Sequence, residues 1–113
     1  MSNTLVSTTY PNLAGKEKRI ETTAALPGNR QLSLTTHRSF DGELITRASV
    51  GIVEGGFVKY LMGRDYNRVF QRGKVRMTKA AVESQHNTYL AQLDQIALDA
   101  TRYYGVSIVK VEG

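Results

Sequence analysis

The residues best suited to a chemical task lie between Arg68 and Thr78. If this segment is a strand, alternate side chains point to opposite faces, because the repeat of a strand is two residues. One face then carries mostly cations, and in chain order it consists of Arg68, Phe70, Arg72, Lys74, Arg76 and Thr78. Lysine and arginine neutralise phosphates and release condensed counterions, so this face fits a polyanion such as RNA. The alternative is an ordinary solvated sheet face, because runs of charge are common on protein surfaces.

Composition favours the same kind of partner. The chain has 113 residues, which predicts one domain spanning residues 1–113. Its formal net charge of +5 favours an acidic partner, with nucleic acid the leading candidate. With 41% hydrophobic and 22% charged residues, the composition is typical of a globular protein. No apolar run approaches the length of a membrane span, so we expect no membrane partner.

Catalytic and metal chemistry find little support in the sequence. The chain has no cysteine, which removes disulfides, thiolate zinc ligands and cysteine nucleophiles. His86 falls on the apolar line of a predicted helix, which favours a packed or interface residue, and no second His or Cys can join His37 in a metal site. No G-x-S-x-G context marks a catalytic serine. We therefore predict no enzyme, no cofactor, no metal and no small-molecule substrate.

The strongest local signal is a hairpin around Phe40-Asp41-Gly42, flanked by residues 31–39 and 43–53. A two-residue turn would mix apolar and polar side chains on both faces, whereas a three-residue loop separates them. That register pairs Leu32 with Val50, Leu34 with Ala48 and Thr36 with Thr46. It predicts a type I turn followed by a bulge, with Gly42 at positive φ. The polar face of this hairpin carries Gln31, Ser33, Thr35, His37, Arg47 and Ser49.

Further strands are expected on both sides of the hairpin. Residues 4–10 are rich in β-branched and aromatic types, and residues 18–25 are typical of an edge strand. Residues 57–62 are predicted to form a short strand. Gly55-Gly56 and Gly63 flank it, which indicates that the whole segment is a mobile connection. Three aromatic residues alternate with the cations, as in base-stacking sites: Tyr60, Tyr66 and Phe70. A position in the core is the alternative, and it is favoured more for Phe70 than for Tyr66.

The pattern changes to a helical period between Val82 and Tyr104. Ser84 or Asn87 could cap the start of this helix, and Gly105 suits its end. The tail, residues 106–111, alternates like a strand. One apolar stripe runs along the helix, and we expect it to form a dimer interface through Tyr89, Leu90, Leu93, Ile96, Ala97, Ala100 and Tyr103.

The order of elements predicts an α+β fold, with an N-terminal strand or hairpin, an antiparallel meander and one long C-terminal helix. A sheet of four or five strands is about 20–24 Å wide, whereas one helix is about 10 Å across. A single helix therefore covers about half of the apolar face, and a second copy could supply the helix that covers the rest. The alternative is that the N-terminal strands fold back over the gap.

This pattern resembles the coat proteins of single-stranded RNA bacteriophages, the levivirus type. The likeness spans most of the chain and is one of element order, covering residues 4–25, 31–53, 54–67, 68–78 and 82–104. Ile20 and Pro27, seven residues apart, and then Leu32-Ser-Leu-Thr35 resemble the central strands of the Pseudomonas phage branch. Asn87-Thr-Tyr-Leu-Ala-Gln-Leu93 resembles its helix. The short segment before Ile20 and the strand-like tail differ from the family pattern.

The resemblance implies a helix-exchanged homodimer whose long helix packs on the sheet of the partner. Such dimers assemble into an icosahedral virion shell in the bacterial host cytoplasm, and their inner sheet face binds genomic RNA or an operator hairpin. Carried over by strand position, the RNA-binding residues are Ser33, Thr35, His37, Arg47, Ser49, Arg72, Lys74 and Arg76. The loop between dimers would contain Gly55, Gly56, Phe57, Tyr60 and Gly63. The alternative is a small dimeric nucleic-acid-binding regulator that forms no shell and does not need that loop for assembly.

Overall fold

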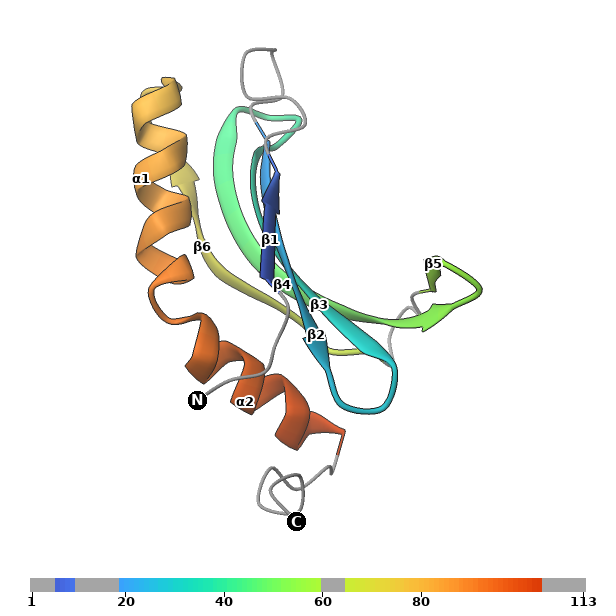
Figure 1. Cartoon of the computed structure of the whole chain (residues 1–113). Helices are drawn as coiled ribbons and strands as arrows, with labels where there is room; N and C mark the ends of the chain where they lie inside the picture. Colours follow the sequence, from blue (N-terminus) through green and yellow to red (C-terminus); the bar gives the residue numbers. More distant parts are fainter. Residues whose placement is uncertain (1–5, 10–18, 60–64, 105–113) are drawn as a thin grey trace.

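A computed structural model describes residues 6–9, 19–59 and 65–104 of the chain (Figure 1). These residues form a six-stranded antiparallel sheet and two helices, an α+β arrangement as predicted. The strands are β1 (Val6–Thr9), β2 (Ile20–Leu26), β3 (Arg30–Arg38), β4 (Glu43–Glu54), β5 (Phe57–Lys59) and β6 (Asn67–Lys74). The helices are α1 (Lys79–Leu90) and α2 (Leu93–Tyr103). The predicted tail strand and Gly105 lie outside the described residues.

The long strand β4 organises the sheet. The strand order is β1-β2-β3-β4-β5, and β6 also pairs with β4. β6 runs beside residues 43–49 of β4, and β5 beside residues 52–54, so the two short strands follow each other along β4. The sheet bends along β4, and both helices lie on its convex side (Figure 1). Neither of the two described helices lies on its concave side.

The structure confirms the predicted register of the central hairpin. Leu32 lies opposite Val50, Leu34 opposite Ala48 and Thr36 opposite Thr46. Gly42 has a φ of 87°, a left-handed conformation that glycine adopts without the steric penalty of a Cβ atom. Apolar side chains therefore point toward the helices, and the polar set points to the concave side.

A bulge in β6 places its cations differently from the prediction. Gln71 lies opposite Thr46, but Val69 lies opposite Arg47, so Phe70 is the extra residue. The predicted cation face is therefore divided between the two sides of the sheet. Arg68, before the bulge, lies on the helix side, whereas Arg72 and Lys74, after the bulge, lie together on the opposite side. β6 also ends at Lys74, so Arg76 and Thr78 lie beyond the strand.

The predicted single helix is divided in two. α1 begins at Lys79, earlier than expected, and its cap is Thr78, whose Oγ1 accepts a hydrogen bond from the Ala81 amide at 3.1 Å. The helices are separated at Ala91 and Gln92, where no glycine or proline interrupts the chain. We attribute the break to packing, because two short helices follow the bent sheet and one straight helix would not (Figure 1).

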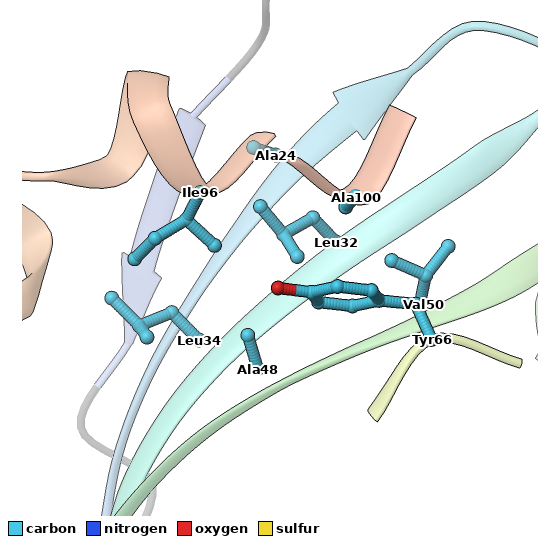
Figure 2. Close-up of a cluster of buried hydrophobic side chains, with 8 residues drawn as sticks. All are labelled: Ala24, Leu32, Leu34, Ala48, Val50, Tyr66, Ile96 and Ala100. Carbon is cyan, nitrogen blue, oxygen red and sulfur yellow. The ribbon is translucent and has the colours of Figure 1, made fainter. Parts of the chain in front are cut away.

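The apolar stripe of the helices packs on the sheet of its own chain. Figure 2 shows side chains from α2 and the sheet gathered in one cluster, made of Ala24, Leu32, Leu34, Ala48, Val50, Tyr66, Ile96 and Ala100. Tyr89, Leu90, Leu93 and Ala97 pack against this cluster, and Tyr103 is 54% exposed. Most of the residues predicted for the dimer interface therefore pack on the sheet of their own chain, and their contact with a second chain stays a prediction.

A buried chain of hydrogen bonds crosses the sheet under α1. His86 is 1% exposed, with its Nε2 2.8 Å from Thr22 Oγ1 and its Nδ1 2.9 Å from Thr36 Oγ1. Thr36 Oγ1 lies 2.7 Å from Thr46 Oγ1, which accepts a hydrogen bond from Gln85 Nε2 at 3.0 Å. Burial lowers the pKa of His86 from 6.5 to about 4, so the ring is neutral at pH 7. The prediction of a packed His86 is confirmed.

The same chain continues to β6 and to the surface. Gln71 Nε2 donates to Gln85 Oε1 at 3.2 Å, and the Tyr89 hydroxyl donates to Gln71 Oε1 at 2.8 Å. Because Gln85 donates to the hydroxyl of Thr46, that hydroxyl is free to donate its own proton to the hydroxyl of Thr36. The Thr36 hydroxyl in turn donates to Nδ1 of His86, so every hydroxyl proton in the chain has an acceptor. His86 then carries its proton on Nε2 and donates it to the hydroxyl of Thr22.

Candidate nucleic-acid interface

The concave face of the sheet brings the predicted RNA-binding residues together. On β3 and β4, Ser33 pairs with Ser49, Thr35 with Arg47 and His37 with Ile45. On β6, Arg72 pairs with Ile45 and Lys74 with Glu43, which places both cations on the same side. All of the predicted positions except Arg76 therefore share this face, which we call the concave face: Ser33, Thr35, His37, Arg47, Ser49, Arg72 and Lys74.

Two polar atoms on the concave face are buried without a hydrogen-bond partner. Ser33 is 2% exposed and Thr35 is 7% exposed, although both described helices lie on the other side of the sheet. Within the described ranges, the Oγ of Ser33 and the Nε of Arg47 have no hydrogen-bond partner. An unsatisfied buried polar atom is unfavourable by about 1–3 kcal/mol. A polar ligand lying on this face could remove that penalty by bonding to them.

The positive charge of the face is partly neutralised. Arg72 donates from Nε and Nη2 to one carboxylate oxygen of Glu43, at 3.2 and 2.9 Å. This pair is exposed, and exposed ion pairs contribute only about 0–1 kcal/mol, so a phosphate could replace the carboxylate at small cost. Lys74 is exposed, and Arg47 is half-buried. Arg68 belongs elsewhere, because its Nη1 lies 2.7 Å from Asp99 of α2 on the helix side.

The pairing also adds residues to this face that the sequence prediction did not include. Thr23 of β2 lies opposite Ser33, and Asn67 of β6 lies opposite Ser49. Their positions follow from the turn at residues 27–29 and from the bulge in β6. Gly28 and Asn29 of this turn have positive φ, and the Pro-Gly-Asn sequence indicates the turn from the sequence alone.

The aromatic residues near the cations do not lie where base stacking requires. Tyr66 is 5% exposed and belongs to the core, which corrects its predicted stacking role. Phe70 stacks on Tyr89 with ring centroids 5.5 Å apart, in agreement with the core interpretation. Tyr60 lies outside the described residues. Strict strand alternation groups Phe70 with the cations, whereas the bulge turns its ring toward the helices.

The predicted loop between dimers is partly an ordered hairpin. Gly55 and Gly56, both at positive φ, form the two-residue turn between β4 and β5. Lys59 and Glu54 form an ion pair at 2.8 Å across it, and Phe57 is 75% exposed. Figure 1 shows this hairpin projecting from the rest of the sheet. The last predicted member, Gly63, lies outside the described residues together with Tyr60.

A pocket of about 440 Å³ lies between the start of β6 and the end of α2. Its lining is Asp65, Tyr66, Asn67, Arg68, Asp99, Arg102 and Tyr103. The carboxylate of Asp99 is bonded to Arg68, and it also accepts a hydrogen bond from the Tyr66 hydroxyl at 3.3 Å. Desolvation, followed by the charge of Asp99, raises the pKa of Tyr66, so this hydroxyl stays protonated and donates.

In the part of the chain that the structure describes, no cluster of histidine and carboxylate side chains is suited to hold a metal ion. No helix among the described residues has the length and hydropathy of a membrane span. Comparisons with protein-family models, with curated proteins and with solved structures gave no match.

Proposed function

We propose that this chain is a structural RNA-binding protein of the RNA-phage coat type. In this proposal, two copies associate, dimers assemble into an icosahedral shell, and the concave face binds single-stranded genomic RNA. The protein acts without a cofactor and without an enzymatic step. Its location would be the virion, after assembly in the cytoplasm of the bacterial host.

The observation that carries the RNA-binding part is the combination of groups on the concave face. Among the described residues, Ser33 Oγ and Arg47 Nε are buried without hydrogen-bond partners, on the same face as the exposed Lys74 and as Arg72, which forms an exposed ion pair. Hydroxyl and guanidinium groups can bond to base edges and phosphates, whereas solvated surface cations alone would not explain buried unpaired atoms. The face therefore suits a ligand with many hydrogen-bonding groups and negative charge.

The shell-forming part is supported by the projecting hairpin. Phe57 is largely exposed at its tip, far from the main core, as a contact between assembled units would require. A regulator that acts as a free dimer has no need for such an extension. The resemblance in element order, from strands to C-terminal helices, supports the same proposal.

Negative-stain microscopy of the expressed protein tests this function, with the ratio of absorbance at 260 and 280 nm measured on the same sample. We expect uniform closed shells that contain host RNA. Free dimers with bound RNA, after gentle purification at low salt, would favour the regulator. Particles or dimers without any affinity for RNA would refute the assignment of the concave face.

A further inference from the structure

The turn between β3 and β4 presents one aromatic ring completely to solvent. Phe40 has a relative exposure of 104%, compared with 75% for Phe57 on the other hairpin. A phenylalanine at a hairpin tip contributes nothing to the core of its own chain. Its ring is available on both faces and around its edge.

Hydrogen bonds hold the backbone on both sides of this ring. The Ser39 amide donates to the Glu43 carbonyl at 2.7 Å, and the Gly42 amide donates to the Ser39 carbonyl at 3.1 Å. The Ser39 hydroxyl accepts from the Glu43 amide at 3.0 Å and donates to the Asp41 carboxylate. The turn backbone is therefore already ordered, and a ligand that binds Phe40 loses little free energy by fixing it.

Exposed cations surround this end of the molecule. The β3–β4 turn, the end of β6 and the start of α1 lie at the same end (Figure 1). The cations at this end are exposed, and the structure gives none of them an ion-pair partner in the described ranges; they are Arg38, Lys74, Arg76 and Lys79. The acid of the turn, Asp41, is bonded to Ser39. The ring thus projects from a mainly positive surface.

We propose that Phe40 is a stacking platform for an unpaired base of single-stranded RNA, whose phosphates contact Lys74, Arg76 and Arg38. This inference rests on the proposed function and extends the RNA path from the concave face to the hairpin tip, since Lys74 belongs to both. Single-stranded nucleic acids are bound by aromatic rings set among cations, because every base has a face that can stack. The core of a protein interface is depleted of charged residues, so this surface suits RNA better than an apolar partner.

A tryptophan reporter tests the stacking directly, because the chain contains no tryptophan. In the Phe40→Trp variant, a single-stranded oligonucleotide should quench the fluorescence as a base stacks on the indole. Phe57→Trp is the matched control, since it places the same reporter on another exposed hairpin, and both variants are titrated with an oligonucleotide too short to join two dimers, so that assembly does not change the signal at position 57. We expect quenching at position 40 and none at position 57. Equal quenching at both positions, or none at 40 while RNA is bound, overturns the inference.

Affinity measurements separate this inference from the proposed function. Phe40→Ala should weaken binding of single-stranded RNA roughly tenfold. Its binding of duplex RNA of the same length should be almost unchanged, because duplex bases already stack on each other. Unaltered single-strand affinity refutes the platform alone, whereas a wild-type protein that binds no RNA refutes the proposed function as well. If Phe40→Ala keeps its RNA affinity but loses self-association by sedimentation, the ring contacts a second copy and the inference is wrong.

Discussion

His86 makes the stability of this fold depend on pH over a defined range. An unfolded histidine titrates near 6.5, whereas burial lowers the pKa of the folded ring to about 4. The unfolded state therefore binds more protons than the folded state between these values, and acid destabilises the fold. A difference of about 2.5 pKa units corresponds to about 3 kcal/mol. This stability is complete above pH 6.5, falls as the pH decreases, and is lost below pH 4.

Urea unfolding followed by far-ultraviolet circular dichroism measures this contribution. The free energy of unfolding should be determined between pH 7.5 and pH 4 for the wild type and for His86→Gln. Carboxylates titrate in both proteins, so their effects cancel in the difference between the two. We expect wild type to be the more stable at pH 7.5, because glutamine cannot reproduce both bonds to Thr22 and Thr36. That advantage should shrink by about 3 kcal/mol on acidification.

His37 is unchanged in both proteins, so any contribution from this residue cancels in the difference as well. A difference between wild type and His86→Gln that stays constant from pH 7.5 to pH 4 would refute the reasoning. The fold would then accept a charged ring under α1.

Four further predictions test other parts of the structure. Arg47→Ala should lower RNA affinity and reduce the salt slope of binding by about one, while Arg102→Ala on α2 should leave that slope unchanged in filter-binding assays. Gly42→Ala should destabilise by about 1 kcal/mol in urea unfolding, because its φ is 87° although an added Cβ meets no atom. Leu34→Ala, which removes a fully buried side chain, should lower the free energy of unfolding by about 2–5 kcal/mol. Thr78→Ala should reduce it by about 1 kcal/mol, and Thr78→Ser should restore it; equal stability of all three proteins would exclude a capping role.

The central hairpin was predictable because its signals are local. Its register follows from the alternation of side chains and from one glycine, Gly42, at the only place where positive φ is required in that loop. The bulge at Phe70 was not predictable, since Val69-Phe70-Gln71 contains no residue that marks a bulge. Pairing with β4 decides it, and such pairing joins segments distant in the sequence.

The break between the two helices and the burial of the polar groups under α1 were also not predictable, because both depend on contacts between segments distant in the sequence. Ala91 and Gln92 favour a continuous helix, so local propensity gives no reason for a break. Thr22 and Thr36 look like surface residues in a strand pattern until His86 is placed between them. Their burial depends on partners 64 and 50 residues away in the sequence. The part of the concave face on β3 and β4 was predictable because it needs only the two strands of one hairpin, whereas the positions of Arg72 and Lys74 also depend on how β6 pairs with β4.

The segment that joins β6 to α1 has a consequence for self-association. It is short, from Val75 to Thr78, and both helices follow it. In the proposed exchanged dimer, the helices would make with the sheet of a second chain the contacts that they make here with the sheet of their own chain. Only the conformation of this segment and the protein concentration distinguish the two arrangements. In the proposed exchanged dimer, Val75 to Thr78 would be the hinge, and we expect substitutions that stiffen this segment to change the oligomeric state while the core contacts stay the same.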